Sequence, residues 1–146
     1  MRTIIVKHTI QAPIERVFDR LADHALYDQF PGVRKSTLAK NGKSNKNGVG
    51  AIREIESGVA WFREEITAYQ RPVRLDYVIL RSFPPLRHGG SSVQLKKVGS
   101  ATEVTWTSSV RLKVPLVGKL LTPLLAAQMA KSYKGCLKAI GRQLAV

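Results

Sequence analysis

The sequence predicts an α+β protein in which one antiparallel sheet packs against one long helix. One strand-like segment and two short helical segments come first. Six segments with alternating side chains then follow one another without an intervening helix, and the chain ends in a long amphipathic stretch. Consecutive strands of this kind pair antiparallel, and their sheet offers one face to a helix and the other to solvent.

Length and composition limit the class of protein further. The chain has 146 residues, which predicts a single domain over residues 1–146. Hydrophobic residues make up 44% of it and charged residues 23%, as in globular proteins. The single cysteine, Cys136, cannot form an internal disulfide. The first residues lack the apolar run of a signal peptide, and no segment approaches the roughly 18 apolar residues of a membrane span, so we expect a cytoplasmic protein.

The first elements are predicted from the period of their side chains. Residues 3–11 alternate polar and β-branched side chains, which is the pattern of a strand. Pro13 suits the first turn of a helix, and apolar residues then recur at helical spacing to about Ala22. A second short helical segment over residues 25–30 stops at Pro31-Gly32.

A period of two indicates the six further strands. The pairs Ser57-Gly58 and Gly99-Ser100 are tight-turn signals that join two hairpins. Residues 83–90 contain two prolines and two glycines, and are predicted to form a turn-rich loop. The strands are predicted over residues 33–40, 49–56, 59–69, 73–81, 92–98 and 102–114.

The last helix is predicted to begin at Thr122-Pro123, because a hydroxyl side chain caps a helix and proline suits its first position. It continues to about residue 145, after a separate short helical segment at residues 116–121. Residues 114–125 carry only one charge, and we expect them to be buried under loops. The alternative is a hydrophobic lip at a cavity mouth beside an anionic membrane. The apolar face of the helix is predicted to hold Leu125, Met129, Ser132, Cys136, Ile140 and Leu144.

Parity separates the two faces of the strands. Arg53 and Glu64 fall on the more apolar face of neighbouring strands, where a charge is costly unless it is paired. We therefore expect these two residues to pair or to line a wet cavity; a partly exposed ion pair near the sheet end is the alternative. The other inward positions include Phe62, Tyr77, Trp106, Ser108 and, on the first strand, His8.

A family resemblance rests on IQAPIERVF at residues 10–18, FPGV at 30–33, VGAIREI at 49–55, and EEI at 64–66 with RLDY at 74–77. In this order, and followed by the amphipathic helix, these stretches resemble the START/birch-pollen-allergen-like superfamily over essentially the whole chain. They resemble in particular its polyketide cyclase/dehydrase and lipid-transport family. The resemblance implies a helix-grip fold, in which a seven-stranded antiparallel sheet wraps around a long C-terminal helix, with two short helices after the first strand. It also implies a hydrophobic cavity between the sheet and that helix.

Several kinds of site are not predicted. His8, His24 and His88 lie far apart without metal-binding spacing, and Cys136 has no second cysteine at CxxC spacing, so no metal is expected. The sequence has no nucleophile elbow for a serine hydrolase. It also has no glycine-rich phosphate loop at the start of a helix, so no cofactor is expected.

The net charge of +14 is unevenly spread, because residues 77–146 carry 11 bases and one acid, Glu103. Such a surface attracts anions, so weak contact with an anionic membrane or another polyanion is expected. The bases are dispersed without aromatic residues between them, and no nucleic-acid-binding motif is present. No specific nucleic-acid partner is therefore predicted.

The predicted function is binding or transport of a small hydrophobic or amphipathic ligand, lipid-like or polyketide-like, with Arg53 suited to its carboxylate or carbonyl group. The first alternative is a cofactor-independent polyketide cyclase/dehydrase, in which Arg53 or Tyr77 polarises a carbonyl oxygen and Glu64 or His8 moves a proton. The second is a basic surface module that binds polyanions or an anionic membrane. For His8, a hydrogen-bonded core residue is the structural alternative. The predicted ligand-binding residues are His8, Arg53, Phe62, Glu64, Tyr77, Trp106, Ser108 and Met129.

Overall fold

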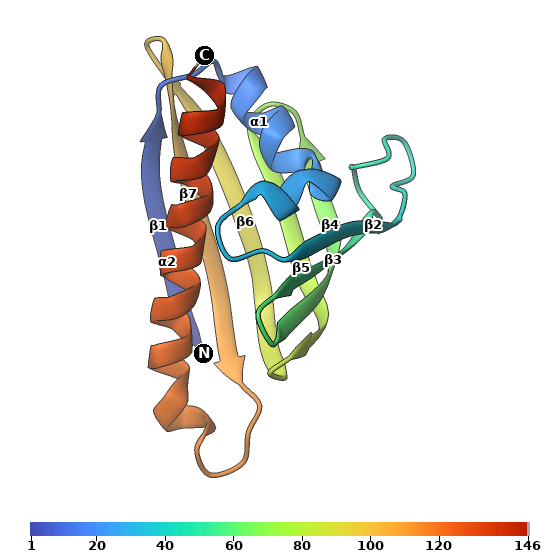
Figure 1. Cartoon of the computed structure of the whole chain (residues 1–146), viewed down its shortest axis with the longest axis vertical. Helices are drawn as coiled ribbons and strands as arrows, with labels where there is room; N and C mark the ends of the chain where they lie inside the picture. The colour runs from blue at the N-terminus through green and yellow to red at the C-terminus, as the bar shows by residue number, and fades with distance from the viewer. Residues whose placement is uncertain (146) are drawn as a thin grey trace.

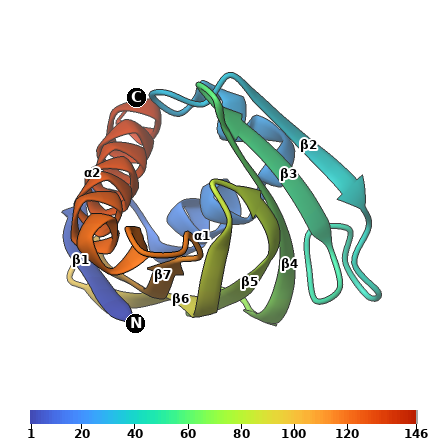
Figure 2. The ribbon, with the colours of Figure 1, turned by 90° about the horizontal axis from the view of Figure 1, so that it is seen from below.

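Seven antiparallel strands form one sheet in the computed structural model, which describes residues 1–145. The order across the sheet is β1-β7-β6-β5-β4-β3-β2, so the first and last strands are neighbours and β2 lies at the opposite edge. The sheet bends around the C-terminal helix α2 (Gly118–Leu144), as Figures 1 and 2 show. The α+β class and the helix-grip architecture are thereby confirmed. The strands are β1 (Arg2–Ile10), β2 (Lys35–Lys40), β3 (Ile52–Ser57), β4 (Ala60–Gln70), β5 (Arg74–Phe83), β6 (Leu86–Val98) and β7 (Ala101–Leu112).

Two short helices connect β1 to β2: α1 (Ile14–Ala22) and the 3₁₀ helix η1 (His24–Gln29). The apolar side of α1 is buried, with Phe18 fully inside the core. Arg71, in the turn between β4 and β5, donates two hydrogen bonds to the carboxylate of Asp19, at 2.7 and 2.9 Å. These bonds tie α1 to the turn between β4 and β5, whereas η1 packs against β2 and β3.

The strand β6 is longer than the sequence predicts, because it begins at Leu86 and not at residue 92. The two glycines that indicated a loop lie inside the strand. Its pairing with β7 shifts between His88 and Ser91, which marks a β-bulge, and Gly90 has a φ of 102° there. Glycine adopts this backbone conformation without strain, so the glycine pair forms a bulge and the strand continues.

The helix α2 begins at Gly118 and not at Thr122, so the two predicted helical segments are one element with Pro123 inside it. The Thr122 hydroxyl donates to the Gly118 carbonyl at 2.6 Å and accepts from the Leu112 N–H at 3.1 Å. It therefore joins the helix to the end of β7 and does not cap the helix. Gly118 permits this junction, because a Cβ there would lie 2.6 Å from the Leu112 carbonyl oxygen.

The buried face of α2 is turned by about one residue from the predicted one. Met129, Cys136 and Ile140 are buried as predicted, but Tyr133 takes the inward place that the prediction gave to Ser132, which is exposed. The first turns of this helix are apolar nearly all round, so their pattern does not fix which side faces the sheet.

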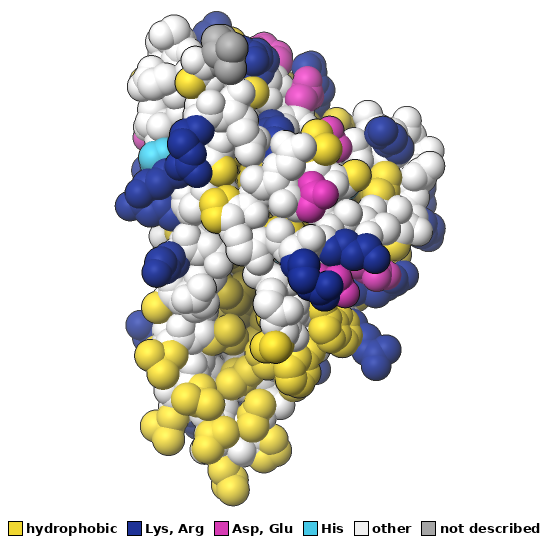
Figure 3. All heavy atoms as spheres, in the orientation of Figure 1, with side chains coloured by type: hydrophobic (Ala, Val, Ile, Leu, Met, Phe, Trp, Pro, Cys, Tyr) yellow, Lys and Arg dark blue, Asp and Glu magenta, His cyan; other side chains and the backbone are white. Residues whose placement is uncertain are grey.

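The predicted burial of residues 114–125 is wrong. Leu116 is 99% exposed, and Leu120 and Leu124 are 76% and 69% exposed. This segment extends past the end of β7, and Figure 3 shows hydrophobic side chains gathered at that end of the molecule. We call this surface the apolar lip, and it consists of Leu116, Val117, Leu120, Leu121 and Leu124.

Candidate functional site

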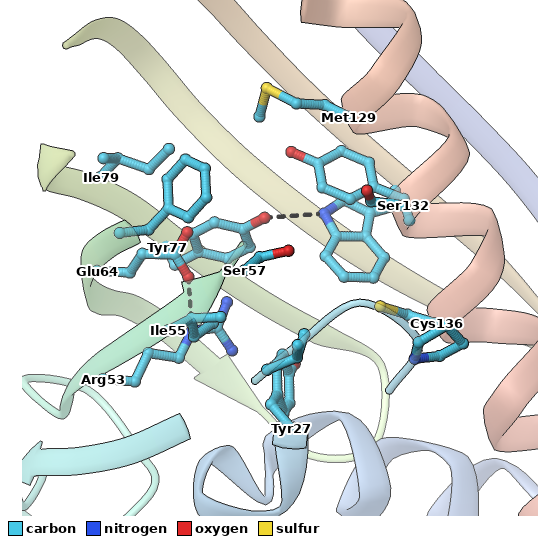
Figure 4. Close-up of a pocket in the computed structure, with 15 residues that line it drawn as sticks. Tyr27, Arg53, Ile55, Ser57, Glu64, Tyr77, Ile79, Met129, Ser132 and Cys136 are labelled. Atoms are coloured by element: carbon cyan, nitrogen blue, oxygen red, sulfur yellow. Dashed lines mark hydrogen bonds and ion pairs between the residues drawn. The ribbon is translucent and has the colours of Figure 1, made fainter. Parts of the chain in front are cut away.

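A cavity of about 120 Å³ lies between the concave face of the sheet and α2 (Figure 4). A dry cavity of about 150 Å³ in another protein holds one benzene molecule, so this cavity is close to the size of a single ring. Pro31 and Ser132 on its rim are exposed, so it opens at the surface between α2 and the loop after η1. The other lining residues are Tyr27, Val33, Arg53, Ile55, Ser57, Phe62, Glu64, Tyr77, Ile79, Trp106, Met129, Tyr133 and Cys136.

Six of the eight residues predicted to bind the ligand lie on the wall of this cavity: Arg53, Phe62, Glu64, Tyr77, Trp106 and Met129. Ser108 lies behind the wall, where its buried hydroxyl is 2.9 Å from the hydroxyl of Tyr133. The strand residues among them come together because β3, β4, β5 and β7 all turn their inward side chains toward the same hollow, whereas Met129 comes from α2.

His8 does not line the cavity. It is half-buried on β1, and burial, followed by the charges of Lys134 and Lys138 on α2, lowers its pKa. The helix α2 packs over β1 and β7, so an inward side chain of β1 meets the helix and not the hollow beyond it. The assignment of His8 to the ligand-binding residues is therefore corrected.

The ion pair of Arg53 and Glu64 forms one side of the cavity. The two residues face each other in the register of β3 and β4, and Arg53 Nε donates to Glu64 Oε1 at 2.7 Å (Figure 4). They are 1% and 6% exposed, so the alternative of a partly exposed pair is wrong. The guanidinium group lies over the rings of Tyr27 and Tyr77, 4.7 and 4.5 Å from their centres. Burial would lower the pKa of Arg53, but the nearby Tyr27 hydroxyl and Glu64 raise it, so the guanidinium stays charged.

His24 of η1 completes what we call the ionic cluster, which comprises His24, Tyr27, Arg53 and Glu64. Its Nδ1 accepts a hydrogen bond from Arg53 Nη1 at 3.1 Å, because an arginine can only donate. Its Nε2–H donates to the Asn47 carbonyl at 2.9 Å. Burial, followed by the charge of Arg53, lowers the pKa of His24 to about 3, so the ring is neutral at neutral pH. The cluster therefore holds one positive and one negative charge, each satisfied by the other.

A set of neutral hydrogen bonds approaches the cavity from the other side. The Ile79 N–H donates to His88 Nδ1 at 3.0 Å, and His88 Nε2 lies 2.8 Å from Ser91 Oγ. Ser91 is hydrogen-bonded to Ser108, and Ser108 in turn to Tyr133. Burial lowers the pKa of His88 to about 4, so this imidazole is also neutral. We call His88, Ser91, Ser108 and Tyr133 the hydroxyl chain.

Tyr77 and Trp106 complete the aromatic wall beside this chain. Trp106 Nε1 donates to the Tyr77 hydroxyl at 3.0 Å (Figure 4), and the indole ring stacks on Tyr133 with the ring centres 4.3 Å apart. Burial raises the pKa of both Tyr77 and Tyr133, so neither phenol ionises at neutral pH. Two neutral phenol hydroxyls therefore stand at the same end of the cavity.

Sequence reasoning did not identify several of these residues. Tyr133 is missed because the predicted apolar face of the last helix passes through Met129, Ser132 and Cys136; placing the aromatic side chain inward would identify it. His88 and Ser91 flank the bulge at Gly89-Gly90, where the sequence predicts a loop, so the sequence pattern does not show that they share a face. For His24 the sequence holds no signal, because η1 brings it to Arg53 from a distant part of the chain.

The residues of the site do not favour metal binding or nucleophilic catalysis by Cys136. Among residues 1–145, no three metal-ligating side chains come together. Burial raises the pKa of Cys136 to about 12, which keeps the thiol protonated and poorly nucleophilic. No helix in the described part of the chain has the length and apolarity to cross a membrane.

Comparison with known proteins relates both sequence and fold to others. Residues 1–145 match the family model described as polyketide cyclase / dehydrase and lipid transport. No curated protein sequence matches the chain. A START superfamily protein from Mycobacterium smegmatis superposes with a TM-score of 0.79 at 10% identity, over 98% of this chain and 97% of that one.

Two further structures show the same arrangement of strands and helix. The Zhui aromatase/cyclase from Streptomyces sp. R1128 has a TM-score of 0.77 at 18% identity, over 99% of this chain and 93% of that one. The protein XoxI from Bacillus cereus has a TM-score of 0.74 at 18% identity, over 99% of this chain and 96% of that one. At such identities the likeness concerns the fold alone.

Proposed function

Since the chain belongs to the polyketide cyclase/dehydrase and lipid-transport family, we propose that it binds one small, neutral, hydrophobic molecule in the cavity between the sheet and α2. The observation that carries this proposal is the aromatic cavity beside the buried pair of Arg53 and Glu64. Apolar walls with a few placed polar groups are typical of sites for small molecules.

The size of the cavity limits what it holds. At about 120 Å³ it has room for one ring or a short branched chain. A long lipid tail or several fused rings would need α2 or the loop after η1 to move outward. The ligand, or the part of it that enters the cavity, is therefore small.

The charges around the cavity limit the ligand further. Arg53 already donates to Glu64 and to His24. A carboxylate that took the place of Glu64 would leave a second carboxylate buried without a partner, which is costly. The ligand is therefore neutral, and the carboxylate that the sequence allowed for Arg53 is not part of this proposal.

Titration with benzene, toluene and naphthalene, followed by NMR at the Met129 methyl and the Trp106 indole, tests this function. We expect the two single-ring compounds to bind and naphthalene to bind much more weakly. The variant Cys136→Leu adds side-chain volume at the cavity wall and should abolish binding, whereas the matched Cys136→Ala should retain it. Wild-type protein that binds none of the three, and that carries no compound in native mass spectrometry, would contradict the proposal.

One observation favours an enzymatic use of the same cavity. Glu64 accepts the hydrogen bond of Arg53 at Oε1, whereas no hydrogen bond within residues 1–145 engages Oε2. A free carboxylate oxygen at a cavity wall can take a proton from a carbon beside a carbonyl group, and this proton transfer begins an aldol-type ring closure. The structural neighbour Zhui is an aromatase/cyclase.

The diketone 2,6-heptanedione, which closes to a six-membered ring by such a reaction, distinguishes an enzyme from a binding protein. An enzyme should accelerate its closure, and Glu64→Gln should abolish the acceleration while the diketone still binds. No acceleration by wild-type protein, or equal rates for the two proteins, would remove the enzymatic alternative.

A second proposal concerns the apolar lip, which we propose contacts an anionic membrane surface. Its five exposed side chains form one patch of the kind that marks interaction sites. The one acid after residue 76, Glu103, pairs with Lys7 toward the opposite end of β7. Apolar side chains surrounded by bases complement a bilayer with anionic head groups. The bases at or beside the lip, none of which has an acidic partner within residues 1–145, are Arg87, Arg111, Lys113 and Lys119.

Flotation with vesicles of phosphatidylcholine, with and without phosphatidylglycerol, tests this contact. We expect binding to the anionic vesicles alone, weakened by salt and lost in the Leu120→Ser/Leu124→Ser double variant. Val98→Ser, at an exposed apolar residue far from the lip, is the matched control and should bind like wild type. Salt-dependent binding that persists in the double variant would instead support the basic surface module and contradict the lip.

A further inference from the structure

In the hydroxyl chain each hydrogen bond is donated in the same direction, and His88 determines which direction this is. The backbone N–H of Ile79 can only donate, so His88 Nδ1 must accept its hydrogen bond. A neutral imidazole carries one proton, which is therefore on Nε2. Hence His88 donates to the hydroxyl oxygen of Ser91.

The hydrogen bonds from Ser91 to Tyr133 are donated in the same direction. Ser91 accepts from His88, and the only other hydrogen bond of its hydroxyl within residues 1–145 is the one to Ser108, so Ser108 is the acceptor available to the Ser91 proton. Ser91 is 4% exposed, and a buried O–H without an acceptor costs free energy. Ser91 therefore donates to Ser108, and Ser108 donates to Tyr133. The reverse direction would leave the Ser91 proton unpaired inside the protein.

The last member of the hydroxyl chain, Tyr133, is a hydrogen-bond donor at the cavity. Tyr133 accepts from Ser108, so its own proton remains to be donated. Tyr77 is in the same position, because its oxygen accepts from Trp106. Both phenols line the cavity. If either phenol donates to the other, the second still has its proton, so one O–H is left for a molecule in the cavity.

We infer that the ligand presents a neutral hydrogen-bond acceptor, the oxygen of a ketone or an aldehyde, to the phenol pair Tyr77 and Tyr133. The inference rests on the proposed ligand-binding function and gives that ligand a chemical class: a small hydrophobic carbonyl compound. A pure hydrocarbon of the same shape would leave the phenol proton without an acceptor, and the site discriminates against it for that reason.

Cyclohexanone and methylenecyclohexane test the inference, because they share one ring and differ in C=O against C=CH₂. The measured quantity is the ratio of their affinities in wild type and in the Tyr77→Phe/Tyr133→Phe double variant, which removes both donors and keeps both rings. We expect the ratio in favour of the ketone to fall by about tenfold in the variant. Comparing ratios cancels the cost of removing the ketone from water.

The affinities of the two compounds also separate a failure of the carbonyl preference from a failure of ligand binding. If both compounds bind and the ratio is the same in the two proteins, the inference is wrong while the proposed function stands. If neither compound binds to wild type, the proposed function fails and the inference fails with it. Should the double variant not fold, the two single variants are measured in the same way, and the inference requires at least one of them to lower the ratio.

The direction of the hydroxyl chain has its own test in Ser108→Ala. In the direction inferred here, Ser108 does not receive the Tyr133 proton, so its removal does not raise the preference for cyclohexanone. In the reverse direction Tyr133 would donate to Ser108, and the variant would release that proton to the cavity and raise the preference. A rise of several-fold would therefore contradict the inference.

Discussion

The ionic cluster and the hydroxyl chain lie on two sides of the same cavity and differ in what they leave free. In the ionic cluster Arg53 and Glu64 form an ion pair, and His24 accepts a hydrogen bond from a second N–H group of Arg53. In the hydroxyl chain every group is neutral, and its last member, Tyr133, keeps a proton to donate. Arg53 has five N–H donors and these bonds engage two of them, so the ionic cluster leaves N–H donors of a charged group, whereas the hydroxyl chain leaves an O–H donor of a neutral one.

The physical reason lies in the cost of an unpaired group. A buried charge without a partner costs several kcal/mol, about 3–5 when one member of a pair is removed. A neutral hydroxyl without a partner costs about 1–3 kcal/mol. A protein can therefore leave a phenol proton for a ligand more cheaply than a guanidinium. We assign the stability of the site to the ionic cluster and the choice of ligand to the hydroxyl chain.

Arg53→Met should show the largest effect and is the strongest test of this division. It leaves Glu64 as a buried carboxylate without its donor, so we expect the free energy of unfolding, measured in urea, to fall by about 3–5 kcal/mol. Arg53→Met combined with Glu64→Leu removes both charges and should recover most of that loss. A loss below about 1 kcal/mol in the single variant would place the pair among weak surface pairs and break the comparison.

Acid should destabilise the protein through the histidine in each cluster. Both rings titrate near 6.5 when unfolded, but the folded pKa is about 3 for His24 and about 4 for His88. Between these values the unfolded chain binds more protons, so stability is lost as the pH falls below about 6.5. Each histidine contributes a slope of about 1.4 kcal/mol per pH unit.

The variant His24→Gln separates the two contributions to this slope. A glutamine can accept from Arg53 and donate to the Asn47 carbonyl without titrating. Urea unfolding between pH 7 and pH 5 should therefore give a smaller slope in the variant, lowered by up to about 1.4 kcal/mol per pH unit, while His88 and His8 keep their contributions. An unchanged slope would mean that the folded protein accommodates a charged His24.

Ser108→Ala should show a smaller effect, because it breaks neutral hydrogen bonds only. The Ser91 proton loses its acceptor and Tyr133 loses its donor, and we expect a loss of about 1–3 kcal/mol in urea unfolding. The neighbouring Ser109→Ala, at a side chain without a hydrogen bond in the described residues, is the control and should change stability by less than about 0.5 kcal/mol. A loss in Ser108→Ala as large as that in Arg53→Met would erase the distinction between the clusters.

Substitutions in the apolar lip should have the smallest effect on the free energy of unfolding, and the losses in the two clusters can be compared with this effect. Its leucines are exposed, so Leu120→Ser/Leu124→Ser should change the free energy of unfolding by about 0.5 kcal/mol or less. A loss of several kcal/mol would show that the lip is packed in solution, against another part of the chain or a second copy.

Much of the fold could be predicted because the side-chain periods determine it. Alternation along β3, β4, β5 and β7 placed Arg53, Glu64, Tyr77 and Trp106 on one face, and the register of the sheet brings them to one hollow. What failed were positions where a residue type has more than one structural use. Gly89-Gly90 forms a bulge and not a turn, and Thr122 binds the end of β7 and does not cap α2.

The candidate site was predicted less completely than the fold, because its second side comes from contacts that no local pattern encodes. His24 reaches Arg53 from η1, across 29 positions of the chain. His8 has the same parity as the core of β1, yet α2 lies between it and the cavity. Parity tells which face a side chain is on, but it does not tell which part of that face the helix covers.

A crystal structure of the protein soaked with iodobenzene tests the central claim most directly, because the anomalous signal of iodine locates the molecule without ambiguity. The account predicts one ring bound between Phe62, Trp106 and Met129, with the Arg53–Glu64 pair unchanged beside it. An interior filled by side chains, with iodine only on the apolar lip or nowhere, would contradict it.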